Sequence, residues 1–199
     1  MSFAIALAAV VVLYILNVLI RSGLFRTVVI SPKRYGGGRV LLKTFTGPYK
    51  DVGRHFESVL KLIGDNLLVD TEIIGIYHDN PEAVSPEKCR SSVGCVVDSI
   101  SDSDTRVAVE KKLSDEGYKM VTLPAQDAVW TEFPFTGIIS VMLSIWKVYG
   151  AFKAFSKGSE DQYMAAHIEI TRMGGVGMTE FYFPKGETCE ELKSYLKDA

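Results

Sequence analysis

Residues 3–20 form an uncharged, strongly apolar run, FAIALAAVVVLYILNVLI, which Arg21 closes. At about 1.5 Å per residue a helix of this length spans roughly 27 Å, which suits a thin bilayer such as that of the endoplasmic reticulum. A cleaved signal peptide fits less well, because no basic residue precedes the run and residues 20–23, IRSG, are a poor cleavage site. The sequence therefore predicts a single transmembrane signal-anchor over residues 1–22.

The charges that follow this run predict its orientation. Seven basic side chains come before the first acidic one, Asp51, so by the positive-inside bias the C-terminal body faces the cytosol. These seven are Arg21, Arg26, Lys33, Arg34, Arg39, Lys43 and Lys50. The three cysteines agree with a cytosolic body, because their number is odd and they lack the paired spacing of a disulfide framework.

The charge balance of the body indicates which partners to expect. Residues 51–199 carry 15 basic and 24 acidic side chains. They contain no basic stripe with aromatic residues interleaved in it, so direct nucleic-acid binding is not expected. The lipid bilayer is the expected partner, and the basic stretch serves as a topology signal or, alternatively, contacts anionic headgroups. No metal or cofactor is expected, since Cys89 and Cys95 have no nearby histidine and residues 174–177, GGVG, lack the last glycine of a dinucleotide fingerprint.

The sequence after the anchor predicts a short linker followed by one domain. Residues 31–38, SPKRYGGG, are rich in glycine and predict a flexible spacer. Residues 23–38 are therefore expected to form a basic, glycine-containing juxtamembrane linker. Residues 39–199 are long enough to fold around a core of their own, and we expect one domain there.

Within residues 39–199 the apolar pattern predicts the order β-α-β-β twice. The first set has a helix from a cap at Asp51 to Gly64 and strands at 39–45, 71–77 and 91–97. The second set has a helix over 136–155, capped by Thr136, and strands at 128–133, 167–171 and 178–183. Between them lie a helix at 104–116 and an extended segment at 118–123. The repeated order predicts an α+β fold built by internal duplication.

A second membrane span is an alternative for the helix expected over residues 136–155, because residues 133–146 carry no charge. The uncharged stretch is too short to cross a bilayer before Lys147, so we expect a helix packed on the sheet. Near the C-terminus, residues 188–191, TCEE, form a capping-box pattern and predict a closing helix.

Several short motifs carry a resemblance to a known family. Residues 76–81, IYHDNP, followed by PEKCR at 86–90 and by Val93-Gly94, resemble the signature of gyrase-inhibitor-like (GyrI-like) domains in the SOUL superfamily. Other patches are similar to the membrane-anchored testis-expressed family of ER-phagy receptors: GPY at 47–49, GRHF at 53–56, FPFT at 133–136, IEI at 168–170 and FYFP at 181–184. With the N-terminal anchor, the resemblance covers nearly the whole chain.

The resemblance implies a fold and a function. It implies two pseudo-symmetric β-α-β-β repeats around a concave groove, in agreement with the predicted duplication. It also implies a single-pass protein of the endoplasmic reticulum membrane, whose cytosolic domain acts as an adaptor or receptor in reticulophagy, the selective autophagy of that organelle. The partners that it implies are ubiquitin-like autophagy modifiers and a AAA segregase, valosin-containing protein.

This sequence departs from the family in one feature. The receptor activity of the family resides in a long acidic tail with an aromatic-x-x-aliphatic motif, whereas this sequence ends at Ala199 after the predicted domain, so we expect the tail to be missing. Matches to the bare motif at 25–28, 49–52 and 56–59 fit poorly, because such a motif must be extended and exposed to pair as an added strand. The autophagy link would then be lost, supplied by a partner or encoded outside this sequence.

The resemblance also indicates a ligand site. In several GyrI-like proteins an inward acidic residue on a late strand meets cationic apolar ligands, and Glu169 in the IEI patch is the matching position. The alternative function is therefore a groove that binds an apolar cation, with Glu169, Tyr163 and Tyr182 as candidate ligand-binding residues. A paired or solvated Glu169 at the edge of the groove stays open beside it.

No catalytic residue is expected, and we predict that the protein is not an enzyme. The sequence has no Gly-x-Ser-x-Gly elbow, no His-Glu-x-x-His pair and no Walker phosphate loop. A minor hydrolase activity is the remaining alternative: some GyrI-like proteins use a groove glutamate, and Glu169 would be the base with Tyr163 or Tyr182 as its hydrogen-bonding neighbour. Arg90 has no predicted place, since it could pair with Glu87 or brace its loop from within.

Overall fold

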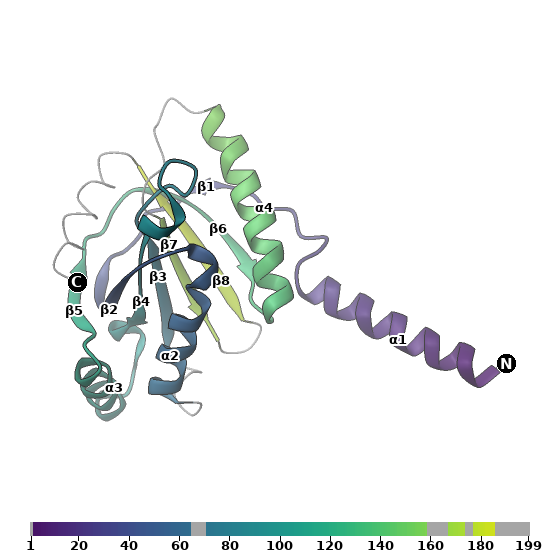
Figure 1. Cartoon of the computed structure of the whole chain (residues 1–199), viewed down its shortest axis with the longest axis horizontal. Coiled ribbons are helices and arrows are strands. Elements are labelled where there is room, and N and C mark those ends of the chain that lie inside the picture. The colour runs from purple at the N-terminus through teal and green to yellow at the C-terminus, as the bar shows by residue number, and fades with distance from the viewer. Residues whose placement is uncertain (1, 65–70, 159–166, 174–176, 186–199) are drawn as a thin grey trace.

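The computed structural model describes residues 2–64, 71–158, 167–173 and 177–185 of the chain. A long N-terminal helix leads into one α+β domain, in which a single large sheet carries its helices on one face (Figure 1). The closing helix predicted near the C-terminus and the candidate site residue Tyr163 lie outside the described residues.

The apolar N-terminal run forms α1, Ser2–Arg21, a helix of 20 residues. Its segment Phe3–Arg21 has a mean hydropathy of 2.8, and none of it is buried inside the molecule. The length and composition of α1 are compatible with the predicted membrane anchor.

Eight described strands form one antiparallel sheet in the order β1-β6-β8-β7-β3-β4-β2-β5. The strands are β1 Ser31–Pro32, β2 Gly38–Thr46, β3 Glu72–Tyr77, β4 Arg90–Val96, β5 Lys119–Leu123, β6 Ala128–Pro134, β7 His167–Arg172 and β8 Met178–Pro184. The helices of the domain are α2 Gly53–Ile63, α3 Ser103–Asp115 and α4 Ile138–Lys157, with short 3₁₀ helices η1 Tyr49–Asp51, η3 Pro86–Lys88 and η4 Val97–Ser99.

The predicted duplication is confirmed. β2, α2, β3 and β4 make the first repeat, and β6, α4, β7 and β8 make the second. In each repeat the third strand pairs between the first and the second, and the two repeats join where β3 pairs with β7. This pseudo-twofold arrangement places Glu169 of β7 opposite Gly75 of β3, near the middle of the sheet.

The three helices of the domain cover one face of this sheet (Figure 1). Their buried contact residues are Val59 and Ile63 of α2, Val109 and Leu113 of α3, and Val148 and Phe152 of α4. The other face carries a separate buried cluster that includes Ile168 and Ile170. Because side chains alternate along a strand, His167 and Glu169 point to the helix-covered face.

α4 packs against the sheet as predicted, but only with one side. It is the second helix in the described residues that is long and apolar enough to span a membrane, with a mean hydropathy of 1.4 and 22% of it buried. Its contacts with Phe133, Phe181 and Phe183 identify it as a helix of the domain.

Both predicted helix caps are wrong. Asp51 ends η1, and α2 begins two residues later at Gly53 without a side-chain cap. Thr136 does not cap α4, which begins at Ile138; instead, the backbone N–H of Thr136 donates to the Ser140 hydroxyl at 2.8 Å. Ser140 is able to do this because it faces inward from the first turn of the helix.

The predicted flexible spacer is wrong for residues 31–35. β1 pairs with β6, and Tyr35 exchanges backbone hydrogen bonds of 2.8 and 2.9 Å with Gln126. The Tyr35 side chain is buried in the core, and Lys33 Nζ donates to Glu180 Oε1 at 3.0 Å. The juxtamembrane linker is therefore bound to the domain, which ties α1 closely to the sheet.

Candidate ligand-binding site

Glu169 lies on the helix-covered face between α2 and α4. On one side is Gly75 of β3, where a Cβ atom would lie 2.6 Å from Cζ of Phe56 in α2, so only glycine leaves room for this ring. On the other side is Phe181 of β8, and Tyr149 of α4 reaches the carboxylate from above. The Glu169 side chain is 17% exposed, so it is largely but not completely buried.

Two phenols and an imidazole surround this carboxylate. Tyr149 Oη donates to Glu169 Oε1 at 2.5 Å, and the Tyr77 hydroxyl bonds the same carboxylate. His167 Nε2 lies 2.6 Å from Tyr149 Oη. Because the Tyr149 hydroxyl donates its proton to Glu169, its oxygen accepts from Nε2–H of His167. The neutral His167 ring is therefore assigned the tautomer that is protonated at Nε2. We call Glu169, Tyr77, Tyr149 and His167 the Glu169 cluster.

Further aromatic rings enclose the Glu169 cluster. His167 stacks on Tyr77 with ring centroids 4.7 Å apart and an interplanar angle of 8°, and Phe183 stacks with His167 at 5.5 Å. Tyr49 meets Tyr77 edge to face at 5.0 Å. Aromatic faces attract cations and bury apolar groups, so the surroundings of Glu169 suit an apolar or aromatic cation.

Burial sets the protonation of these groups. Desolvation raises the pKa of Glu169 to about 7, although the hydrogen bonds from Tyr149 and Tyr77 oppose the shift. Desolvation also lowers the pKa of His167 to about 3, so this ring is neutral. The pKa values of Tyr77 and Tyr149 lie well above their usual range, mainly through burial. Near neutral pH, Glu169 is therefore the one member of the Glu169 cluster that changes its charge.

Tyr182 does not belong to the Glu169 cluster. The residue paired opposite Glu169 is Phe181, so Tyr182 points to the other face of the sheet, where its hydroxyl donates to Glu180 Oε2 at 2.8 Å. The prediction that Tyr182 is a hydrogen-bonding neighbour of Glu169 is wrong for this reason. A ligand-binding role for Tyr182 or for Tyr163, which lies outside the described residues, stays a prediction.

Glu180 shows how a carboxylate of the same sheet is neutralised from within. Lys33 Nζ lies 3.0 Å from Oε1, and Arg172 Nη2 lies 3.6 Å from Oε2. Burial alone would raise the pKa of Glu180, but the hydrogen bonds from Tyr182 and Lys33 outweigh it and lower the pKa. Among the described residues Glu169 has no such cationic partner. The only group within ion-pair distance of its carboxylate there is the His167 ring, whose Nε2 lies 3.8 Å from Oε1.

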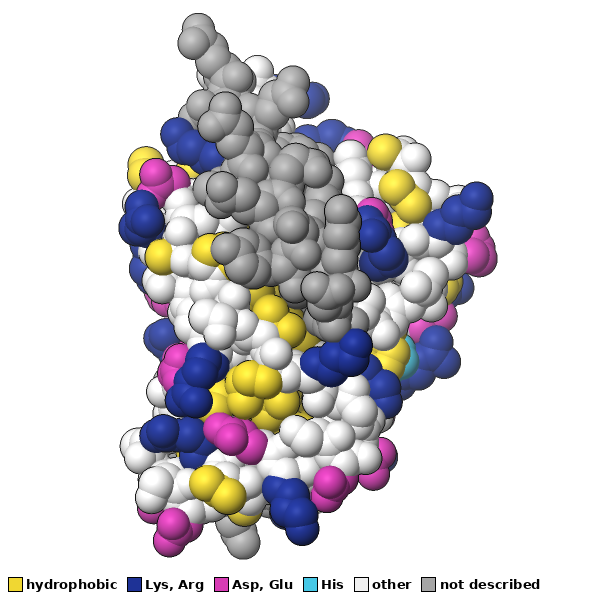
Figure 2. Space-filling model, turned by 90° about the vertical axis from the view of Figure 1, so that its left-hand side faces the viewer, with side chains coloured by type: hydrophobic (Ala, Val, Ile, Leu, Met, Phe, Trp, Pro, Cys, Tyr) yellow, Lys and Arg dark blue, Asp and Glu magenta, His cyan; other side chains and the backbone are white. Residues whose placement is uncertain are grey.

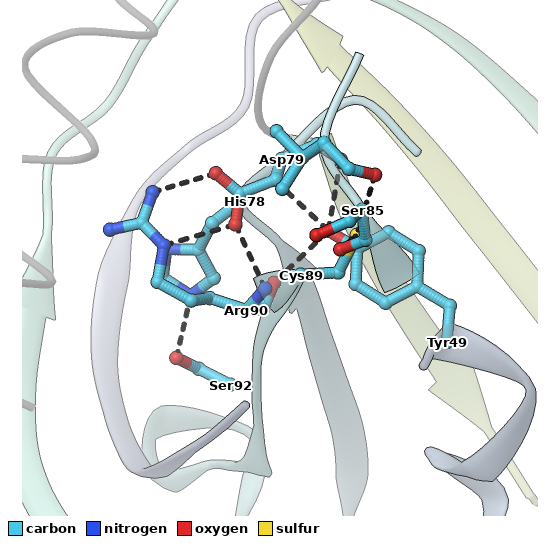
Figure 3. A network of polar contacts seen from close by, with 8 residues as sticks. Tyr49, His78, Asp79, Ser85, Cys89, Arg90 and Ser92 are labelled. Carbon is cyan, nitrogen blue, oxygen red and sulfur yellow. Dashed lines mark hydrogen bonds and ion pairs between the residues drawn. The ribbon is translucent and has the colours of Figure 1, made fainter. Parts of the chain in front are cut away.

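The loop between β3 and β4, residues 78–89, carries the family-like motifs, and we call it the signature loop. It forms a second polar cluster with the start of β4 (Figure 3). The Arg90 guanidinium donates two hydrogen bonds to the Asp79 carboxylate, from Nε to Oδ2 at 3.0 Å and from Nη2 to Oδ1 at 2.7 Å. The backbone N–H of Arg90 adds a third bond to Oδ2 at 2.8 Å. Arg90 therefore braces its own loop through Asp79, and the alternative pairing with Glu87 is not the one that the structure contains.

The rest of this loop is fastened in a similar way. His78 Nε2 lies 2.8 Å from the hydroxyl of Ser92, and Asn80 Oδ1 accepts from the backbone N–H of Glu82 at 2.9 Å, which closes an Asx turn. The buried Cys89 thiol lies 3.6 Å from the carbonyl oxygen of Ser85. These bonds hold the ends of β3 and β4, so the signature loop serves the fold. Across the described residues, no group of His, Cys, Asp and Glu could hold a metal ion.

The duplicated sheet with an acidic residue between two helices defines a class of protein. Residues 38–184 match the family described as a GyrI-like small molecule binding domain, and the chain belongs to this GyrI-like family. The C-terminal domain of EcmrR has the same fold, with a TM-score of 0.52, 12% identity and coverage of 80% of this chain and 98% of that domain. An integron cassette protein from Vibrio cholerae has a TM-score of 0.54, 10% identity and coverage of 79% and 95%.

Two curated relatives are more similar in sequence. The testis-expressed protein 264 homolog of Mus musculus is 29% identical over 170 residues, which cover 80% of this chain and 52% of the relative. Testis-expressed protein 264 of Homo sapiens is 29% identical over 119 residues, which cover 59% of this chain and 36% of the relative. The chain thus spans about half of the length of the mouse relative and about a third of the human one.

Three members of the Glu169 cluster were absent from the sequence-based prediction: Tyr77, Tyr149 and His167. His167 left a signal, because it lies two residues before Glu169 in the predicted strand, whereas Tyr77 joins it only through the β3–β7 register, in which the two residues pair. Alternation along these strands brings both side chains to the face of Glu169. Tyr149 left none, since its contact depends on where α4 crosses the sheet.

Proposed function

We propose that this chain is a membrane-anchored protein whose GyrI-like domain binds a small apolar cation against Glu169. The Glu169 cluster carries the proposal: a carboxylate on a central strand, 17% exposed, is contacted by two phenols and a neutral imidazole. No Lys or Arg of the described residues pairs with it, in contrast to Glu180. A ligand cation would complete the ion pair, and the stacked rings would cover its apolar part.

The test is binding of tetraphenylphosphonium to the full chain in detergent micelles at about pH 8, measured by calorimetry. Glu169→Gln keeps the shape of the side chain but removes its charge, so we expect the affinity to fall about tenfold or more, or about 1.4 kcal/mol. Glu180→Gln is the matched control, because this glutamate lies on the other face and already has Lys33 as its partner. Equal affinities of the unaltered chain and Glu169→Gln would contradict the proposal.

We propose binding rather than catalysis at this carboxylate. Hydrolysis of an electrophilic small molecule is the competing use, in which Glu169 would act as the general base. Turnover of an activated ester by the full chain, lost in Glu169→Gln but kept in Glu180→Gln, would favour the hydrolase.

A second candidate function is an adaptor role in reticulophagy, favoured by the similarity to testis-expressed protein 264. In that role α1 would hold the domain on the cytosolic face of the endoplasmic reticulum membrane, with ubiquitin-like autophagy modifiers and valosin-containing protein as partners. The motif matches in the described residues offer little to such partners, because Val52 and Val59 are buried and Phe56 lies inside α2. Phe25 alone among their aromatic and aliphatic positions is largely exposed, at 71%.

Proximity labelling tests the adaptor role separately. A labelling enzyme fused after Ala199 would be compared in fed and starved cells. Starvation-dependent labelling of autophagy modifiers, together with cytosolic-face proteins of the endoplasmic reticulum, is the result that the adaptor role predicts. Labelling of endoplasmic reticulum proteins without the modifiers would count against it and leave the ligand-binding proposal intact.

A further inference from the structure

The outer side of α4 is apolar, although it faces away from the sheet. Four large side chains recur there at helical spacing and expose most of their surface: Ile138 (73%), Met142 (65%), Ile145 (57%) and Trp146 (70%). We call these four residues the outer face of α4. On the inner side of the same turns the buried residues are the small and polar Ser140 and Ser144. This inverted pattern predicts an apolar neighbour outside the domain.

The end of α1 is fastened beside this outer face. Lys147 follows Trp146 in α4, and its Nζ donates to the carbonyl oxygens of Leu24, of Gly23 at 3.3 Å and of Arg26 at 2.9 Å. Arg26 in turn pairs with Glu132 of β6 at 2.7 Å. One ammonium group thus binds three backbone carbonyls within residues 23–26, the segment that leaves α1.

Two more contacts fix the junction. Gly23 has a φ of +90°, and a Cβ atom there would lie 2.6 Å from Cζ of Phe133, so the chain turns tightly over this ring. The Ser22 hydroxyl lies 3.1 Å from that of Thr136. α1 therefore leaves the domain at a fixed place next to α4 (Figure 1).

The apolar character is confined to the part of α4 near α1. An open cleft of about 470 Å³ lies there, lined by residues 24–28 and by Trp146, Lys147, Gly150 and Ala151. Farther along the helix the exposed positions become Lys153 and Lys157, at the end of α4 that lies away from α1 (Figure 1). The side of the molecule opposite α1 carries Lys and Arg side chains interspersed with Asp and Glu, with hydrophobic side chains among them (Figure 2).

We propose that the outer face of α4, together with Phe25, lies in the interfacial layer of the membrane that α1 spans. The inference rests on the anchor in the proposed function and adds a second membrane contact within the domain. Trp146 and Phe25 are of the aromatic type that partitions to this layer, and the apolar strip ends where Lys153 and Lys157 reach the headgroups or water. The bilayer is the occupant because the α1 junction holds this face at the membrane surface.

The fluorescence of Trp146 tests the contact in the full chain. The chain has two tryptophans, and Trp130→Phe leaves Trp146 as the single reporter. The protein is reconstituted into phosphatidylcholine vesicles with bromines at different depths of the acyl chains. We expect quenching that is strongest for bromines nearest the headgroups, and weak quenching by acrylamide from the water side.

Two variants in the Trp130→Phe background separate this contact from chance proximity. Ile138→Glu with Met142→Glu places charges on exposed positions of the outer face, and we expect it to abolish the bromolipid quenching. Val107→Glu is the matched control, since Val107 of α3 is also 64% exposed but lies on another helix, and it should leave the quenching unchanged.

Vesicle flotation distinguishes the two possible failures. A chain that does not float with vesicles overturns the anchor, and with it both the proposed membrane attachment and this inference. A chain that floats while Trp146 stays unquenched by bromolipid overturns this inference alone. Trp146 protected from both bromolipid and acrylamide also overturns it, because a second protein surface would then cover the outer face of α4.

Discussion

Asp79 and Glu169 are two largely buried carboxylates of one domain, with 12% and 17% of their side chains exposed, but their surroundings differ. The Arg90 guanidinium grips Asp79 and lowers its pKa, whereas burial among phenols raises the pKa of Glu169 to about 7. Within the part of the chain that the structure describes, Asp79 therefore has a cationic partner, whereas Glu169 pairs with no Lys or Arg. In this domain the most diagnostic sequence motif holds the fold, and the less distinctive IEI strand carries the candidate site.

The largest effect is expected from Asp79→Asn. It removes the charge that Arg90 pairs with, and we expect the free energy of unfolding of the full chain in micelles to fall by about 3 kcal/mol at neutral pH. The folded-state pKa of Asp79 is depressed, so its contribution is present above the unfolded pKa, about 3.9, and is lost as the pH falls through the folded value. The difference between variant and unaltered chain should therefore shrink in acid.

Glu87→Gln is the control for this measurement, because Glu87 is exposed and does not pair with Arg90. We expect its unfolding free energy to stay within about 0.5 kcal/mol of the unaltered chain. A loss as large as that of Asp79→Asn would contradict the assignment of the Arg90 partner. Tetraphenylphosphonium binding should survive in Glu87→Gln, since Glu87 is exposed and does not belong to the Glu169 cluster.

Glu169→Gln should have the opposite sign. The folded-state pKa, about 7, lies above the unfolded value, so stability from protonated Glu169 is complete below about pH 4 and is lost as the pH rises through about 7. Gln cannot ionise and escapes this loss, so we expect the variant to be about 2 kcal/mol more stable at about pH 8, with no gain in acid. Glu180→Gln, which removes a paired charge, should destabilise under the same conditions.

The affinity for a cation should depend on pH through the same group. Binding requires ionised Glu169, so below about pH 7 the affinity for tetraphenylphosphonium should fall about tenfold per pH unit and level off above it. Calorimetry in buffers of different ionisation enthalpy should detect a released proton near neutral pH. A flat profile between about pH 5 and 8 would show that Glu169 is not the charge that the cation meets.

The smallest effect is expected from Tyr149→Phe. The variant loses the hydroxyl that links His167 to Glu169, and we expect about 1 kcal/mol of destabilisation at about pH 8. The pKa of Glu169 should rise further, because the lost hydrogen bond favoured the ionised form. Tyr182→Phe is the matched control on the other face, and the titration of Glu169 should not respond to it.

The repeats were predictable from sequence because their strands and helices are local patterns. Alternation along 39–45 and the helical spacing of residues 52–63 each appear within one element, and the structure confirms both as β2 and α2. The closeness of Tyr77 and His167 depends on the register between β3 and β7, which no local pattern contains. The Tyr149 contact and the bound linker at Tyr35 depend on tertiary packing, which explains why the first was missed and the second was predicted as a spacer.

The most direct test is the titration of the Glu169 carboxyl carbon by ¹³C NMR in the full chain, with the resonance assigned by its loss in Glu169→Gln. The account predicts a pKa near 7 that falls when tetraphenylphosphonium is added, because the cation stabilises the ionised carboxylate. A pKa near the ordinary glutamate value, about 4.3, that does not move with the cation would contradict it.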